Sequence, residues 1–561
     1  MNQNRRQPIV NCILIVSCMT AAVAAHFTAT DAKACGGFFC QQVPIDQAGE
    51  QIIFRKDGIF VTAMVLIQYT GEAEEFSWVV PVSGIPELSV GSDAVFASLE
   101  TSTRPQFILE TNGQRCPSDD GDFNFGGGGA TSDSADDGDD GVDVLERLAV
   151  GPFDVEVITS NDAEALATWL GSNGYELTER GEELIGPYVN EGKNFVALKL
   201  RQDQGVGDIE PLIMRCQTGN ATIPIRLTAV AAQDNMGVLV WLMGDSRAVP
   251  LNYLHVTPNY TRLNWYAGTF NAYASYQGLI TAAMDEAGGQ GFATDYAGTD
   301  FDPNTSLPTV ETYTDELVYL AGFPDDADFV AELANTFVFP QDKVLAILGR
   351  ELPLPEGEDS FIYSVPELLN DTFTAEQLAD ARMQIVVEIN ETIVKPLENA
   401  LAMFDGKPYM TRMYTTLSAD EMSLDPSFSF NPDLEDQPMT RRARMDVDCN
   451  FGATTWSLTL GEGTGRNGEL VINGSGDPPG FSAPTIDQES MWRSERVDTS
   501  GPPVTETLRT FGVARVIGAD SSGGSNGSAC GVGLFGCGGG TVGTLLLTMF
   551  GLGLLKRRTH P

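Results

Sequence analysis

Basic residues and histidine are scarce in this chain: among 561 residues, 33 Lys and Arg stand against 77 Asp and Glu, and three are His. The net charge of -44 argues against nucleic acid as a partner, because phosphate binding requires a surface rich in Lys and Arg. His26 and His560 lie near the two ends, which leaves His255 alone in the body of the chain. A site with several histidine ligands is therefore excluded, and no HExxH motif occurs.

Motifs of the common enzyme classes are also missing. No G-x-S-x-G elbow and no P-loop occur in the sequence. Residues 463–468 spell G-x-G-x-x-G, but a strand-like segment follows where dinucleotide binding needs a helix, so we predict a hairpin loop there. His255 lies in an apolar context, where we expect a hydrogen-bonded structural histidine rather than a catalytic one. A Ser/His255 site or a pair of carboxylates, such as those near Glu72, stays open as an alternative.

Residues 1–34 are typical of an export signal. A positive start at Arg5 is followed by an apolar stretch, and the small residues Ala32 and Ala34 mark a cleavage site. We therefore expect ordinary secretion, with Cys35 as the first mature residue. Two alternatives stay open, an uncleaved membrane anchor and a lipoprotein modified at Cys35.

The other end of the chain has three consecutive parts. These are a Gly/Ser/Cys linker at 518–537 with Cys530 and Cys537, an uncharged stretch at 538–555, and a basic end at 556–561 with Lys556, Arg557 and Arg558. The uncharged stretch, as a helix of about 27 Å, is just long enough to cross a thin hydrocarbon core, and the basic end would remain cytoplasmic. The alternative is a buried core helix. This tail resembles the bacterial C-terminal sorting tails named for myxobacteria, which implies export and sorting machinery as partners and anchoring through the membrane.

Cysteines of an exported chain are expected to form structural disulfides. Cys35 and Cys40 are close enough in sequence for a small loop, which the glycines between them permit. The remaining body cysteines are Cys116, Cys216 and Cys449, so at least one thiol has no partner within the chain.

Residues 118–143 contain nine aspartates, a run of glycines and no Lys or Arg. Such a segment cannot bury enough apolar surface to offset its conformational entropy, so we predict a disordered acidic loop. The alternative is a calcium site, because carboxylates are hard oxygen ligands. Calcium is the only cofactor that the sequence suggests. Its candidate ligands are Asp136, Asp137, Asp139, Asp140 and Asp143.

Hydrophobic periodicity predicts an α+β fold with mixed or antiparallel sheets and packed helices. We expect an α+β ectodomain at 35–295 and a second region at 296–517 that is helix-rich and then β, so that the second half is the more helical. The local predictions are a hairpin at 51–69, a helix from Asp93, a helix capped by Asn161, a strand pair at 223–230 and 238–243, and helices at 327–333, 342–348 and 375–404, the last interrupted at Pro396.

Several segments together resemble the bacterial family called domain of unknown function 2330. They include CGGFFC at 35–40, WLGSNGYEL, IPIRLTAVAAQDNMGVLVWLMG and MTRMYTTLSADEMSLDPSF, and the likeness extends with gaps from Cys35 to about residue 430. The resemblance implies an exported, envelope-associated protein and assigns no catalytic residue or cofactor.

The leading hypothesis is thus an exported protein, anchored in the cell envelope or at the outer surface through a single C-terminal membrane segment. Its expected role is noncatalytic binding or structural support. The alternative is an extracytoplasmic hydrolase that uses paired carboxylates or a Ser/His255 site.

Overall fold

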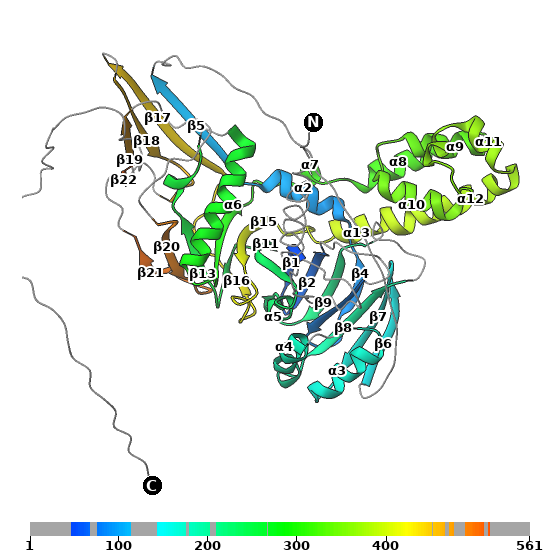
Figure 1. The fold of residues 1–561 in the computed structure, drawn as a ribbon, viewed down its shortest axis with the longest axis horizontal. Helices are drawn as coiled ribbons and strands as arrows, with labels where there is room; N and C mark the ends of the chain where they lie inside the picture. The colour runs from blue at the N-terminus through cyan, green and yellow to red at the C-terminus, as the bar shows by residue number, and fades with distance from the viewer. Residues whose placement is uncertain are drawn as a thin grey trace, which may run out of the picture. The chain divides into compact units, whose positions relative to one another are not determined.

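The computed structural model describes residues 47–67, 76–113, 143–175, 179–201, 209–265, 268–450, 453–465, 471–475, 489–509 and 514–515. The chain divides into two units, Met1–Ala519 and Asp520–Pro561, and every described residue belongs to the first. The fold is mixed α+β, as the sequence predicts, with several sheets and packed helices (Figure 1).

The largest sheet of the described residues has ten strands. Their order is β21 (Val504–Leu508), β20 (Met491–Arg496), β13 (Leu254–Pro258), β14 (Gly291–Gly298), β15 (Tyr409–Leu417), β11 (Ala232–Gly244), β1 (Gln47–Asp57), β2 (Phe60–Ile67), β9 (Leu212–Gln217) and β4 (Glu87–Val90). The pairs β1/β11 and β13/β14 are parallel, and the other neighbours in this sheet are antiparallel. The predicted hairpin is confirmed as β1–β2, with Gly58 in the left-handed region at its turn.

The part of the chain that the structure describes also contains three smaller sheets. One has the order β3 (Ser77–Val82), β8 (Asn194–Leu200), β7 (Phe153–Thr159), β6 (Asp143–Val150); another has β22 (Ala514–Arg515), β19 (Val471–Ser475), β18 (Ala453–Leu460), β17 (Thr440–Asn450), β5 (Gln106–Gly113). The third has β10 (Ala221–Thr222), β16 (Ser427–Asn431), β12 (Arg247–Pro250). Since β18 pairs antiparallel with β19, the G-x-G-x-x-G motif precedes a strand, as predicted.

The central strand β11 supplies both faces of the large sheet with core residues. Trp241 and Leu239 belong to one hydrophobic core, and Val240 and Leu242 belong to a second core on the opposite face. Alternate residues of a strand point to opposite faces, so a strand covered on both sides reads as a continuous apolar run. The helix α6 (Gly268–Glu286) contributes Tyr276 and its buried neighbours to the first of these cores.

The remaining helices fall into two groups. Near the four-stranded sheet lie α3 (Ala163–Ser172), α4 (Glu179–Asn190) and the short α5 (Ile225–Thr228), and α2 (Asp93–Thr103) precedes β5. The other group, coloured from green to yellow in Figure 1, comprises α7 (Pro303–Ser306), α8 (Val310–Ala321), α9 (Asp326–Asn335), α10 (Gln341–Glu351), α11 (Pro366–Thr372), α12 (Ala375–Ile389) and α13 (Lys395–Leu401). A π-helical turn, Asn390–Val394, separates α12 from α13 just before Pro396, where the sequence predicts an interruption.

Two local predictions were wrong, and one helix was not predicted. The cap of α3 is Asp162, whose carboxylate accepts from the amides of Glu164 and Ala165, rather than Asn161. The segment expected as a strand at 223–230 forms α5, because it packs into two cores at once and so shows no one-sided periodicity. Helix α4 was not predicted, and Pro187, a residue that disfavours a helix interior, lies inside it.

Several predictions concern residues outside the described part of the chain. These are the export signal at 1–34, the disulfide candidates Cys35 and Cys40, the tail at 518–561, and the acidic loop except for Asp143, which begins β6. Within the described residues, no helix has both the length and the apolar character needed to cross a membrane.

Candidate functional site

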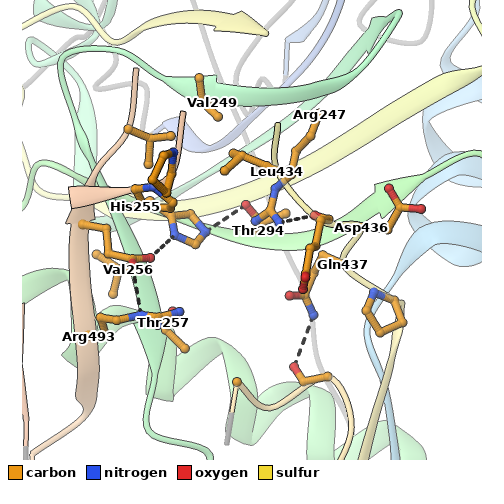
Figure 2. A pocket seen from close by; sticks show the side chains of 18 of the residues that line it. Arg247, Val249, His255, Val256, Thr257, Thr294, Leu434, Asp436, Gln437 and Arg493 are labelled. Carbon is orange, nitrogen blue, oxygen red and sulfur yellow. Dashed lines mark hydrogen bonds and ion pairs between the residues drawn. The ribbon is translucent and has the colours of Figure 1, made fainter. Parts of the chain in front are cut away.

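A cavity of ≈ 550 Å³ opens beside one end of the large sheet, and we call it the polar basin. Its walls come from β12, β13, β14 and β20, and from three connecting segments at 433–438, 461–465 and 502–503 (Figure 2). A volume of this size suits a small molecule. Strands that are far apart in sequence thus place charged side chains around one hollow.

His255, the single histidine of the chain's body, lies in the wall of the polar basin on β13. Its Nε2 is 3.1 Å from Oγ1 of Thr294, and its Nδ1 is 3.5 Å from Oε2 of Glu495 (Figure 2). Both carboxylate and imidazole are largely buried, with 7% and 14% of their side chains exposed. Burial lowers the pKa of His255, with help from Arg247 and Arg493, although Glu495 opposes the shift. The imidazole is therefore neutral at neutral pH.

Glu495 is held on its other side by Arg493, whose Nε lies 3.3 Å from Oε1. Burial alone would raise the pKa of Glu495, but the hydrogen bond from His255 and the charges of Arg493 and Arg247 outweigh it, so the pKa is lowered. The carboxylate stays ionised and can only accept hydrogen bonds.

Arg247, on β12, brings a second cation to the polar basin. Its Nη1 donates to the carbonyl of Glu435 at 2.7 Å, while its buried Nε has no hydrogen-bond partner among the described residues. Burial lowers its pKa, yet a guanidinium keeps its charge in proteins. A buried donor without an acceptor is costly, so this nitrogen is suited to an acceptor from a ligand.

Carboxylates form the rest of the lining. Asp436 accepts from the hydroxyl of Tyr409 at 2.5 Å, and Asp433 accepts from an amide of the 501–503 segment at 2.7 Å. Glu435 and Glu462 line the same hollow. The wall of the polar basin therefore contains both arginines and several carboxylates.

A buried ionic network supports the strand that carries Thr294. The side chain of Arg441 is fully buried and donates to the carbonyls of Asp295 at 2.8 Å and Thr294 at 3.3 Å. The next residue, Asp295, pairs with the buried Arg412 at 3.2 Å and accepts from Tyr276. These contacts fix the backbone of β14 at the wall of the polar basin.

Two other cavities are less suited to chemistry. One of ≈ 600 Å³ contains buried charges that pair with each other, Lys343 with Glu210 at 2.9 Å and Arg350 with Glu388. The other, of ≈ 310 Å³, includes Cys216, which is buried and has no disulfide partner among the described residues. Burial raises the pKa of this thiol to about 11, so it stays protonated and unreactive.

A comparison with protein-family models shows to which family the chain belongs. The model of DUF2330, described as an uncharacterized protein conserved in bacteria, matches residues 29–339, which is more than half of the chain. The chain belongs to the DUF2330 family. No curated protein and no solved structure gave a match. Within this DUF2330 protein, the matched part contains Arg247, His255 and Thr294, while Glu495 and Arg493 lie beyond it.

The structure of this DUF2330 protein brings together residues that the sequence did not single out. His255 was considered from the sequence, but Thr294, Glu495, Arg493 and Arg247 were missed, since no motif spans them. The hydroxyl that contacts His255 belongs to Thr294 and not to a serine.

The carboxylates and metal candidates that the sequence did single out are not among the residues placed in the polar basin. The acids near Glu72 and the calcium candidates Asp136, Asp137, Asp139 and Asp140 lie outside the described residues, as does the side chain of Asp143. Among the side chains that are described, no cluster of three or more His, Cys, Asp or Glu is placed to hold a metal ion.

Proposed function

We propose that this protein is an exported binding protein of the cell envelope, which holds a small zwitterionic ligand in the polar basin. The export signal at 1–34 and the sorting tail at 518–561 support the location, and the basin supports the binding role. A single C-terminal membrane segment at 538–555 would anchor the chain. A Cys35–Cys40 disulfide would lie at the start of the mature chain.

The observation that carries the binding proposal is the buried Nε of Arg247, which has no acceptor among the described residues. A carboxylate or carbonyl oxygen of a ligand would satisfy it with a charge-assisted hydrogen bond. The neighbouring carboxylates Asp433, Glu435, Asp436 and Glu462 repel a purely anionic molecule and favour one that also carries an amine. A ligand with a carboxylate and an ammonium group, such as an amino acid or a short peptide, fits both requirements.

Isothermal titration calorimetry of the full chain, purified in detergent, tests this proposal. The probe is alanylalanine, compared with its N-acetyl form, which lacks the cation, and its amide, which lacks the carboxylate. A charge-assisted hydrogen bond in a buried site contributes about 1.5–3 kcal/mol, so each loss should weaken binding roughly 10- to 100-fold.

Substitution assigns the effect to the basin. Arg247→Gln should weaken binding of alanylalanine by the same factor and leave binding of its amide nearly unchanged. The matched control is Arg215→Gln on β9, where the arginine bonds the exposed Glu87 at the surface. Equal affinity for all three probes, or no heat with any of them, would refute the ligand chemistry.

The location has its own tests. N-terminal sequencing of the exported protein should begin at Cys35, and mass spectrometry of unreduced peptides should show Cys35 joined to Cys40. Truncation after Ala529 should release folded protein from the membrane fraction. A truncated chain that still sediments wholly with membranes would show that another segment is the anchor.

The acidic segment at 118–143 is proposed to be dispensable for folding. Its deletion should leave the melting temperature nearly unchanged in calcium-free buffer. If calcium raises the melting temperature of the intact chain and not of the deleted one, the segment is a calcium site instead.

A second candidate function, hydrolysis, is favoured by one specific observation. The hydroxyl of Thr294 lies in contact with a neutral imidazole whose other nitrogen faces a carboxylate.

A further inference from the structure

Three neighbouring strands place a hydroxyl, an imidazole and a carboxylate in one line along the polar basin. His255 on β13 is the backbone partner of Glu495 on β20, and its ring reaches Thr294 on β14 (Figure 2). The two ring contacts are 3.1 Å and 3.5 Å. The second is long, as contacts in catalytic groups often are before a substrate binds.

Both ends of this line lie where the strand pairing is irregular. The register of β14 against β15 shifts between Thr294 and Tyr296, and the register of β20 against β21 shifts between Ser494 and Glu495. A bulge redirects side chains and is common beside active sites. At the first bulge Arg441 holds the carbonyls of Thr294 and the next residue. The threonine hydroxyl is thus held against His255 by backbone contacts.

The protonation states follow from the donors and acceptors. The carboxylate of Glu495 only accepts, so Nδ1 of His255 carries the proton. This leaves the lone pair of Nε2 facing the hydroxyl of Thr294, which donates to it. An imidazole that is neutral and held in this tautomer is ready to take a proton from the hydroxyl.

Arg247 supplies the remaining element of such a site. Charge that develops on a carbonyl oxygen during acyl transfer needs preorganised donors. The buried Nε of Arg247 has no partner among the described residues, and the residue Arg247 lines the same hollow as Thr294.

We propose that Thr294 is the nucleophile of an esterase site, with His255 as general base, Glu495 as the residue that orients it, and Arg247 as the oxyanion donor. The substrate class is a carboxylic ester that carries an amino group, which rests on the ligand chemistry proposed above. An ester is chosen because its alkoxide leaves more readily than the amine of an amide.

The reaction has two steps. As Oγ1 of Thr294 bonds to the ester carbonyl carbon, its proton passes to Nε2 of His255 and the carbonyl electron pair moves onto oxygen. The intermediate collapses, the bond to the alcohol oxygen breaks, and the alcohol leaves with the proton from Nε2. Water, activated by the same imidazole, then cleaves the acyl-threonine and releases the acid, which restores Thr294.

The test uses the full chain with alanine p-nitrophenyl ester as probe. The wild type should release p-nitrophenol with an initial burst, and mass spectrometry after rapid acid quench should find the acyl group on the peptide containing Thr294. Thr294→Val should lower kcat/KM by about 10³-fold or more, as loss of a nucleophile does. Thr294→Ser should stay within about tenfold of the wild type, because it keeps the hydroxyl.

Two further readouts separate catalysis from a structural role. Glu495→Gln should lower kcat by about 10⁴-fold, because it favours the wrong tautomer of His255. Burial and the charges of Arg247 and Arg493 lower the pKa of His255, and Glu495 only partly opposes them. The acid limb of the pH profile should therefore lie below pH 6.5. Thr62→Val, on β2 of the same sheet, is the matched control and should be as active as the wild type.

Thr294→Val with the activity of the wild type, or an acyl group found on another residue, would overturn the proposal. An ester that binds and is not turned over would overturn catalysis and leave the binding proposal standing. Alanylalanine should still bind to Thr294→Val, which shows that this variant has folded.

Discussion

Replacing Glu50 by glutamine is expected to stabilise the protein at pH 8 and to change its stability much less at pH 5. Glu50 lies on β1 between backbone partners Val238 of β11 and Ile67 of β2, and the residue is 6% exposed. Its Oε2 has no hydrogen-bond partner among the described residues. Burial raises its pKa from 4.5 to about 7, because the charged form loses its hydration.

The sign of the effect follows from this raised pKa. The folded protein keeps the proton of Glu50 up to about pH 7, whereas the unfolded chain releases it near pH 4.5. The contribution of Glu50 to stability is therefore fully present below pH 4.5 and is lost as the pH rises through 7. Each pKa unit corresponds to about 1.4 kcal/mol, so the loss is about 2.5 kcal/mol between pH 5 and pH 8.

Urea unfolding followed by tryptophan fluorescence measures this loss. The quantity of interest is the difference in free energy of unfolding between Glu50→Gln and wild type, compared at the two pH values. Taking this difference removes the effect of the other carboxylates. From pH 5 to pH 8, the free energy of unfolding of the variant should rise by about 2.5 kcal/mol relative to that of the wild type.

The control is Glu87→Gln on β4 of the same sheet, where the side chain is 74% exposed and pairs with Arg215. This exposed pair should contribute about 0–1 kcal/mol. If Glu50→Gln destabilises the protein equally at pH 5 and pH 8, Glu50 is ionised and paired in the folded state, and the reasoning is wrong.

Three substitutions test packing and capping by the same unfolding measurement. Arg412→Met should lower the free energy of unfolding by about 3–5 kcal/mol, because it leaves the buried Asp295 without its cation; a loss below about 1 kcal/mol would contradict this. Gly244→Ala should cost about 1–3 kcal/mol, since a Cβ there overlaps the ring of Phe430, and a neutral result would show that the ring has room to move. Thr374→Ala should cost about 1 kcal/mol by removing the capping box of α12, and full rescue by serine but not by valine is the expected check.

Several helices and one hairpin of this protein follow from the pattern of apolar residues within their own segments. The hairpin of β1 and β2 follows from two apolar runs around Gly58, and α9, α10 and α12 follow from their apolar periodicity. Where a segment is buried on two sides, as in α5, periodicity carries no information and the prediction was wrong. The sequence also identified the family.

Only the tertiary structure determines which side chains come together in the polar basin. His255 and Glu495 are 240 positions apart, and they meet because β13 and β20 pair in one register, which no local pattern specifies. Thr294 contacts His255 from β14, beside a bulge at which Arg441 donates to the Thr294 carbonyl. The sequence by itself therefore determined many of the helices and strands, although not α4 or α5, and it pointed to His255. The pairing of distant strands decided which side chains surround that histidine, because contacts across a sheet depend on register and not on proximity along the chain.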